Sequence, residues 1–319
     1  MADAENATRA PESDAAERQT APSAAGDTAA QTAPAAGQHC VTDRPTPPGQ
    51  SSTGEIIKLN DIDVYISKPA DYPHAQSKLL LLLTGGTGIR STNNQLQADK
   101  FASEGFLVLM PDFLAGDTSP ASVAIADDSA SVLEQVKLKA AEVTKSFMLD
   151  MWLARVTPDR VMPLLGRVVD AAREQFADAV EHGGGIYAVG YCVGGRFVLL
   201  LAQETAGADG DAAAAGGGRK KGPCIRAGAL AHGASVAPDD FAGLAAPLSL
   251  VCVEDDPLFP DAVRAAGEHA MSAGDLEHEV RVYPGVPHGF AVVGAYADSV
   301  ITEAQATAYE QMLKWIKEH

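Results

Sequence analysis

One hexapeptide decides the fold of this chain: Gly190-Tyr191-Cys192-Val193-Gly194-Gly195. The apolar run before it, residues 186–189, is typical of a buried strand, and the run after it, residues 196–202, is typical of a helix. A glycine-flanked turn between a strand and a helix is a nucleophile elbow, in which a strained turn raises one side chain above the sheet. Glycine suits such a turn because a sharp reversal brings backbone atoms to places where side chains would clash. The raised residue is Cys192, so the hexapeptide indicates thiolate chemistry.

Strand-like and helix-like segments alternate from Glu55 onward. The predicted strands are residues 56–59, 62–66, 79–83, 106–110, 186–189, 227–231, 248–253 and 279–283. The first two flank Asn60-Asp61, which predicts a hairpin turn. Helices are predicted at 93–104, in two or three pieces between 120 and 183 with a restart at Thr157-Pro158, and at 304–317. This alternation predicts one α/β domain, with a mostly parallel sheet and helices on both of its faces.

The composition excludes several classes of protein. The chain has 319 residues and a net charge of −18, which argues against nucleic acid or an anionic membrane surface as a partner. No apolar run is long enough to span a bilayer, and the N-terminus lacks the basic start and apolar stretch of a secretory signal. Four cysteines in so long a chain do not indicate a disulfide framework. We therefore predict a cytoplasmic protein with reduced thiols.

Two segments differ in composition from the rest of the chain. Residues 1–37 are rich in Ala, Thr, Pro, Gln and acids and hold no aromatic residue, so they cannot bury enough apolar surface to fold. We predict a disordered tail there, because its acids argue against a transit peptide. Residues 206–222 combine an Ala/Gly run with Arg219-Lys220-Lys221 and predict a flexible surface insertion. The folded domain is accordingly predicted over residues 38–319.

Three polar residues follow three of the predicted strands. Cys192 follows the strand at 186–189, Asp256 follows the strand at 248–253, and His288 lies in the loop after the strand at 279–283. Side chains beyond the carboxyl ends of parallel strands gather at one edge of the sheet. The chain order of nucleophile, acid and histidine is the order found in α/β-hydrolases. The sequence therefore predicts an α/β-hydrolase fold.

Each of these residue types has a task in acyl transfer. A thiol near pH 7 is only slightly ionised and needs an adjacent imidazole to form the thiolate. The imidazole needs a carboxylate on its other nitrogen to fix its tautomer. The oxyanion of the tetrahedral intermediate needs two N–H donors, which we expect from Val193 after the elbow and from Gly86 in the loop at 84–88.

Several alternatives remain open at this point. Asp255 and Asp256 are nearly equivalent as the acid, and an acid in this loop can also serve as a helix cap. His232, after the strand at 227–231, competes with His288 for the role of the base. Cys224 and Cys252 are interpreted as buried small hydrophobes.

The glycine-rich loop at 84–89 also has a rival interpretation, because a strand followed by glycines begins dinucleotide-binding folds. The spacing argues against it, since Ser91 stands where the third glycine belongs. No cluster of His, Cys, Asp and Glu in the sequence has metal-ligand spacing. We therefore predict neither an organic cofactor nor a metal.

At these residues the chain resembles the dienelactone hydrolase family. The matching segments are Gly190 to Gly195, Gly105 to Phe113, Asp256 to Pro260 and Pro287 to Phe290, and Cys40 to Gly54 is similar to the N-terminal extension of eukaryotic members. The resemblance covers about residues 40–319 and implies that Cys192, Asp256 and His288 form a catalytic triad. It also implies hydrolysis of a small ester or lactone through an acyl-cysteine intermediate, without a metal or an organic cofactor.

The chain departs from the family pattern at two positions. Bacterial dienelactone hydrolases carry a glutamate near the thiol in the loop where this chain has Gly85, and an arginine for the substrate carboxylate where it has Val292. Arg155 is a candidate for a replacement cation. The alternative to the enzyme is a non-catalytic member in which the altered loop serves ligand binding or interaction.

Overall fold

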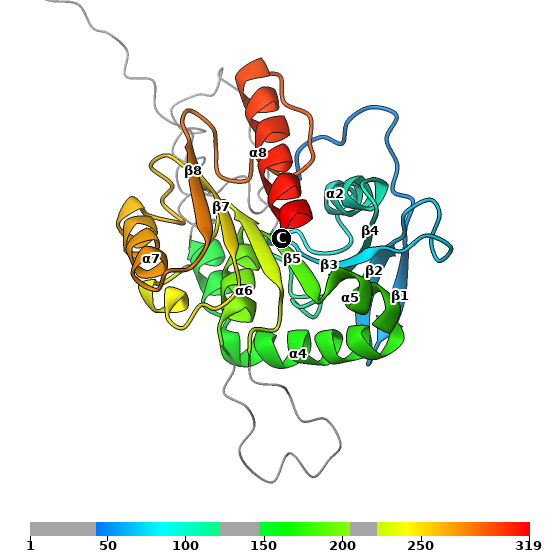
Figure 1. The fold of residues 1–319 in the computed structure, drawn as a ribbon. Helices are drawn as coiled ribbons and strands as arrows, with labels where there is room; N and C mark the ends of the chain where they lie inside the picture. The colour runs from blue at the N-terminus through cyan, green and yellow to red at the C-terminus, as the bar shows by residue number, and fades with distance from the viewer. Residues whose placement is uncertain (1–42, 121–146, 205–221) are drawn as a thin grey trace, which may run out of the picture. The chain divides into compact units, whose positions relative to one another are not determined.

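An eight-stranded sheet forms the core of the fold in a computed structural model that describes residues 43–120, 147–204 and 222–319 (Figure 1). The strands lie in the order β1-β2-β4-β3-β5-β6-β7-β8. Their bounds are β1 (Glu55–Leu59), β2 (Ile62–Ser67), β3 (Lys78–Leu83), β4 (Phe106–Pro111), β5 (Ile186–Tyr191), β6 (Ala227–Ala231), β7 (Leu248–Val253) and β8 (His278–Tyr283).

Most strand pairs in this sheet are parallel. Strand β2 is antiparallel to both β1 and β4, and every other neighbouring pair is parallel. The β1–β2 hairpin turns at Asn60 and Asp61, whose φ angles of 45° and 64° match a two-residue turn of the type that favours Asn and Asp. The parallel strands bring their carboxyl ends to one edge of the sheet, where a site is expected.

Helices cover both faces of the sheet. Their bounds are α2 (Thr92–Ser103), α4 (Pro158–Gln175), α5 (Ala177–Gly183), α6 (Val193–Ala202), α7 (Asp261–Ala273) and α8 (Ser299–Glu318), with a short 3₁₀ helix η2 (Pro238–Phe241). Residues 147–153 are also helical. Figure 1 shows α2 and α8 on one face and α4, α5 and α6 on the other, as the packing of their side chains confirms.

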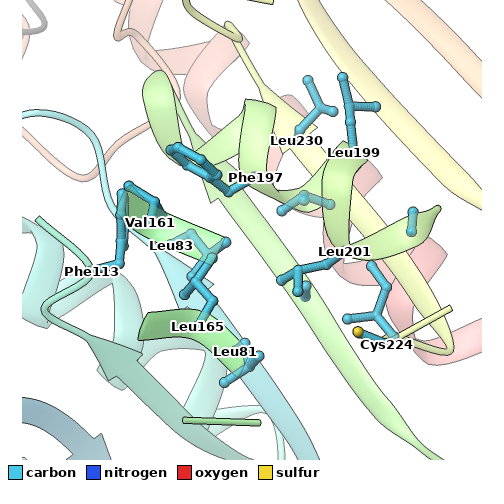
Figure 2. Close-up of a cluster of buried hydrophobic side chains, with 14 of the residues drawn as sticks. Leu81, Leu83, Phe113, Val161, Leu165, Phe197, Leu199, Leu201, Cys224 and Leu230 are labelled. Carbon is cyan, nitrogen blue, oxygen red and sulfur yellow. The ribbon is translucent and has the colours of Figure 1, made fainter. Parts of the chain in front are cut away.

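Two apolar clusters result, one on each face of the sheet. Figure 2 shows part of the first, in which Leu81 and Leu83 of β3 lie with Leu165 of α4 and Phe197 of α6. The second holds Leu80 and Leu82 of the same strand with side chains of α2 and α8. Successive residues of β3 thus alternate between the clusters, and burial on both faces explains why this strand is an unbroken apolar run.

The α/β-hydrolase fold predicted from the sequence is confirmed, and each predicted strand is present. Helix α4 starts at Pro158 after its N-cap Thr157, as the restart signal predicted. The last helix starts five residues earlier than expected, because Asp298 caps it by accepting a hydrogen bond from the N–H of Val300 at 2.8 Å. The predicted tail of residues 1–37 and all but the last residue of the predicted insertion lie outside the described residues.

Candidate active site

Cys192 occupies the turn between β5 and α6 in a backbone conformation that is rare for an L-residue. Its φ is 54° and its ψ is −122°. A Cβ atom at Gly190 would lie 2.5 Å from the carbonyl oxygen of Gly194, and one at Gly194 would lie 2.3 Å from that of Leu83. Both glycines are therefore required by close backbone contacts, as the sequence predicts for an elbow.

Hydrogen bonds to the end of β6 hold this strained turn in place. The N–H of Cys192 donates to the carbonyl oxygen of Ala231 at 3.1 Å, and the Cys192 carbonyl accepts from the N–H of Ala234 at 3.0 Å. Backbone strain of this kind persists only where neighbouring structure fixes it, and it is common at functional sites.

His288 and Asp256 form a buried pair next to the elbow. His288 Nδ1 and Asp256 Oδ2 are 2.6 Å apart, as in a hydrogen bond from the imidazole to the carboxylate, and the two residues are only 6% and 2% exposed. The other carboxylate oxygen of Asp256 accepts from the N–H of Leu258 at 3.0 Å. Asp255 is exposed, and the cap residue of α7 is Pro260. The structure thus pairs Asp256, not Asp255, with the histidine.

The surroundings of His288 favour its charged form. Burial by itself lowers the pKa of the imidazole. Hydrogen bonding and charge from Asp256 and Cys192 outweigh burial and raise the pKa of His288 to about 9. An imidazolium between a carboxylate and a thiolate is an arrangement that stabilises both anions.

His232, the other candidate base, lies in the same site but in a different position. Its ring centroid is 4.8 Å from that of His288, and it is 1% exposed with a φ of 39°. Its ring also lies near those of Tyr191 and Phe290. His288 therefore has the carboxylate partner, and His232 packs against His288.

Cys192 lines a pocket whose empty space, open solvent included, is about 410 Å³. The residues that line it are Asp43, Arg44, Gly85, Thr87, Asn93, Asn94, Cys192, His232, Gly289, Val292 and Val293. Asp43 and Arg44 were missed by the sequence analysis, because nothing local in the sequence signals that a segment before the first strand reaches the elbow.

The two positions that depart from the family pattern both line this pocket. A Cβ atom at Gly85 would lie 3.3 Å from Cys192 Cβ and 4.0 Å from its Sγ, so position 85 directly faces the thiol. Val292 lines the same pocket. The suggestion that Arg155 supplies a cation here is wrong, because Arg155 pairs with Asp117 at 3.0 Å and lines a separate pocket of about 320 Å³.

One expected oxyanion donor follows Cys192 in the chain, and the other follows Gly85, the residue that faces the thiol. Val193 is the first residue of α6, so its N–H has no partner within the helix. Gly86 follows the glycine that faces the thiol, and its carbonyl is fixed by a 2.8 Å hydrogen bond from the N–H of Ser119. Within the described residues, no group of three or more His, Cys, Asp or Glu could hold a metal ion. No helix of the described part is long and apolar enough to cross a membrane.

The family assignment follows from comparison with known proteins. A family model, described as the dienelactone hydrolase family, matches residues 62–319. The chain is 26% identical over 266 residues to "Hydrolase pyvD" of Aspergillus violaceofuscus, covering 83% of this chain and 90% of that protein. It is 23% identical over 264 residues to "Dienlactone hydrolase 1" of Gibberella moniliformis, covering 83% and 87%. The chain belongs to the dienelactone hydrolase family of α/β-hydrolases and is a hydrolase that acts on ester bonds.

Solved structures agree on the fold. A putative dienelactone hydrolase from Klebsiella pneumoniae matches with a TM-score of 0.58 at 17% identity, covering 85% of this chain and all of that one (100%). An esterase from Thermogutta terrifontis, solved with bound propionate, matches with a TM-score of 0.52 at 16% identity, covering 84% and 96%. At such low identity these similarities describe the fold alone.

Proposed function

We propose that this chain is a cysteine-dependent hydrolase of small esters or lactones that acts through an acyl-cysteine intermediate. The observation that carries the proposal is the buried hydrogen bond of 2.6 Å between His288 and Asp256, beside the thiol that the elbow raises. Cys192 is the nucleophile, His288 moves the proton, and Asp256 holds the imidazole in one tautomer. The pocket that Cys192 lines gives a substrate access to the thiol.

In the acylation step, the Cys192 thiolate attacks the carbonyl carbon of the substrate. The carbonyl oxygen becomes an oxyanion, which the N–H groups of Gly86 and Val193 stabilise. The C–O bond to the alcohol then breaks, and His288 gives its proton to the departing oxygen. In a lactone the acyl and alcohol parts stay joined, so the alcohol remains attached to the acyl-enzyme.

In the deacylation step, the now neutral His288 takes a proton from a water molecule, and the hydroxide attacks the thioester. The C–S bond breaks, the carboxylic acid leaves, and the proton returns the site to its thiolate and imidazolium form. The cycle consumes one water molecule and needs no redox partner.

The thiolate in this scheme forms without an acid in the 84–88 loop. Two features favour it: the imidazolium of His288, whose pKa is raised to about 9, and the N-terminal end of α6, which begins directly after Cys192. The glutamate that serves the bacterial enzymes is therefore dispensable for ionisation in this site.

Alkylation by iodoacetamide tests the nucleophile. We expect Cys192 to react rapidly below pH 7, and a Cys192→Ala variant to lose that fast phase in a mass-spectrometric assay. Burial raises the pKa of Cys252 to about 12, so a Cys252→Ala variant serves as the matched control and should label like the wild type.

Turnover of p-nitrophenyl butyrate tests the remaining roles. Cys192→Ser and His288→Gln should each lower kcat/KM by about 10²-fold or more while the circular dichroism spectrum stays unchanged. Full activity in His288→Gln would contradict the assignment of the base. Slow, ordinary alkylation of Cys192, with no turnover of any ester or lactone, would instead support a non-catalytic binding protein.

A cytoplasmic location stays a prediction of the sequence.

A further inference from the structure

A short segment before the first strand forms one wall of the active-site pocket. We call residues 43–45 the strap; Asp43 and Arg44 of the strap line the same pocket as Cys192. The strap precedes the part of the chain that the family model matches, residues 62–319. Asp43 and Arg44 therefore add polar side chains to the pocket that the matched region does not supply.

Hydrogen bonds at three successive residues hold the strap against the domain. Asp43 Oδ1 accepts from the hydroxyl of Ser91 at 2.8 Å, and the carbonyl oxygen of Arg44 accepts from Nδ2 of Asn93 at 2.6 Å. The carbonyl oxygen of Pro45 accepts from the N–H of Ala295 at 2.9 Å. The strap is thus a fixed wall and not a loose end, so its polar groups face a ligand in defined positions.

Asn93, which holds the strap in place, has a side-chain acceptor with no partner among the described residues. The residue is 1% exposed and lines the pocket. Its Nδ2 donates to Arg44, which fixes the orientation of the amide. Its Oδ1 accepts no hydrogen bond from any residue that the structure describes. Buried acceptors in folded proteins are almost always paired, so an unpaired one in an active-site pocket points to a donor that arrives with the ligand.

The charges nearby select the kind of donor. The Asp43 carboxylate lines the pocket and, like Asn93 Oδ1, attracts donors and repels a carboxylate. The guanidinium carbon of Arg44 lies 4.7 Å from the centre of the Tyr296 ring, a cation–π contact, and Arg44 lines the pocket as well. A neutral hydroxyl matches the two acceptors, Asn93 Oδ1 and the Asp43 carboxylate, better than an anion does.

We propose that Asn93 and Asp43 form a recognition subsite for a hydroxyl group, so that the natural substrate is a hydroxylated ester or lactone whose hydroxyl donates to Asn93 Oδ1. The proposal rests on the proposed function, because it assigns the substrate class of that same pocket. It places the specificity of the enzyme partly in the strap, outside the matched region.

Matched esters that exchange a hydroxyl for a methyl group test the subsite. The pairs are p-nitrophenyl 2-hydroxybutyrate with 2-methylbutyrate, 3-hydroxybutyrate with 3-methylbutyrate, and 3-(4-hydroxyphenyl)propionate with 3-(4-methylphenyl)propionate. In at least one pair we expect kcat/KM for the hydroxyl ester to exceed that for the methyl ester by about tenfold or more. The three pairs place the hydroxyl at different distances from the scissile carbon.

Two variants distinguish the two roles of Asn93, which are to accept a hydrogen bond from the substrate through Oδ1 and to hold the strap through Nδ2. Asn93→Leu removes both polar atoms, and the preference should fall to about twofold or less. Asn93→Asp keeps an acceptor oxygen but loses the amide that donates to Arg44, and it should keep most of the preference. Val293→Ala is the matched control, because it changes an apolar residue of the same pocket and should leave the ratio unchanged.

Binding measured without turnover keeps the subsite testable if the proposed function fails. A Cys192→Ala variant lacks the nucleophile, so NMR titration with the same ester pairs reports affinity alone. The expected result is a Kd about tenfold lower for the hydroxyl ester of the preferred pair. Wild-type turnover with equal rates in all three pairs would leave the proposed function standing and overturn the subsite.

Two further outcomes would also overturn it. The first is a mono-p-nitrophenyl succinate that is turned over at least tenfold faster than every hydroxyl ester, which would indicate a carboxylate subsite. The second is an Asn93→Leu variant that loses thermal stability but keeps the hydroxyl preference. That result would mean that Asn93 Oδ1 bonds to Nε2 of Gln97, one helical turn further along α2, which is also buried and unpaired among the described residues.

Discussion

At the scale of single residues, the ionisation of His288 links the chemistry of the site to the stability of the fold. The imidazole is buried, yet Asp256 and Cys192 raise its pKa to about 9. An unfolded chain would give the same group a pKa near 6.5. A histidine that binds its proton more tightly in the folded state stabilises the fold wherever the proton is present.

The pH dependence of stability follows from that difference. The contribution of His288 should be complete below pH 6.5 and lost as the pH rises through about 9, at a cost of roughly 3 kcal/mol. Urea denaturation at pH 6.5 and pH 9.5 measures it. The wild type should lose more free energy of unfolding over this range than a His288→Gln variant. Parallel losses in the two proteins would contradict the raised pKa.

At this scale the sequence predicted the nucleophile better than it predicted the side chains that contact the nucleophile or its histidine. Cys192 could be singled out because the close contacts of Gly190 and Gly194 leave a local signature. The choice between Asp255 and Asp256 needed the family resemblance, since adjacent acids differ only in where the loop directs them. Arg44 could not be found at all, because its place in the pocket depends on contacts with residues about 50 positions away.

At the scale of elements, the joint between β5 and α6 depends on how closely α6 approaches β3. Gly194 lies in the first turn of α6, where a Cβ atom would meet the carbonyl oxygen of Leu83 at 2.3 Å. At the next residue, Gly195, the nearest atom would be Leu230 Cβ at 3.3 Å, which a small shift can relieve. The two glycines lie in the same helix, but only Gly194 has no room for a Cβ atom.

Alanine substitution at these two glycines should therefore give opposite results. Both changes gain about 1 kcal/mol of helix propensity. Gly194→Ala should still lower the free energy of unfolding by roughly 3 kcal/mol or more, because backbone must move and the elbow with it. Gly195→Ala should change it by less than about 1 kcal/mol. Urea denaturation decides between them, and equal effects would refute the steric account of the elbow.

Element boundaries show which signals in the sequence were local. The hairpin turn at Asn60-Asp61 and the start of α4 at Pro158 follow from turn and cap preferences of the residues themselves. The order of strands in the sheet does not follow from local preferences. Strand β4 lies between β2 and β3 because of contacts that form only when the chain folds. The alternation of strand-like and helix-like segments predicted a mostly parallel sheet, and packing decided the order of the strands within it.

At the scale of the whole molecule, the sheet separates two apolar layers. Leu165 of α4 belongs to the cluster in Figure 2, and Ile316 of α8 belongs to the cluster on the other face. Both residues are fully buried. Since the sheet lies between them, each layer should respond to substitution independently.

Double-mutant analysis tests this independence. Leu165→Ala and Ile316→Ala should each cost about 2–5 kcal/mol, and the double variant should lose the sum to within about 0.5 kcal/mol. Leu165→Ala combined with Leu81→Ala serves as the comparison, because both residues lie in one cluster and should couple. A large coupling across the sheet would show that the layers act as one.

The course of α6 has a consequence for protein engineering. The helix starts at Val193, directly after Cys192 on the pocket edge of the sheet, and ends at Ala202. Gln203 then bridges to Leu244, and β6 begins at Ala227. Because β6 runs parallel to β5, α6 ends and β6 begins at the edge opposite the pocket. New termini created at residues 203 and 223, which the structure describes, should therefore keep clear of the substrate, and such a circular permutation should spare the catalytic edge.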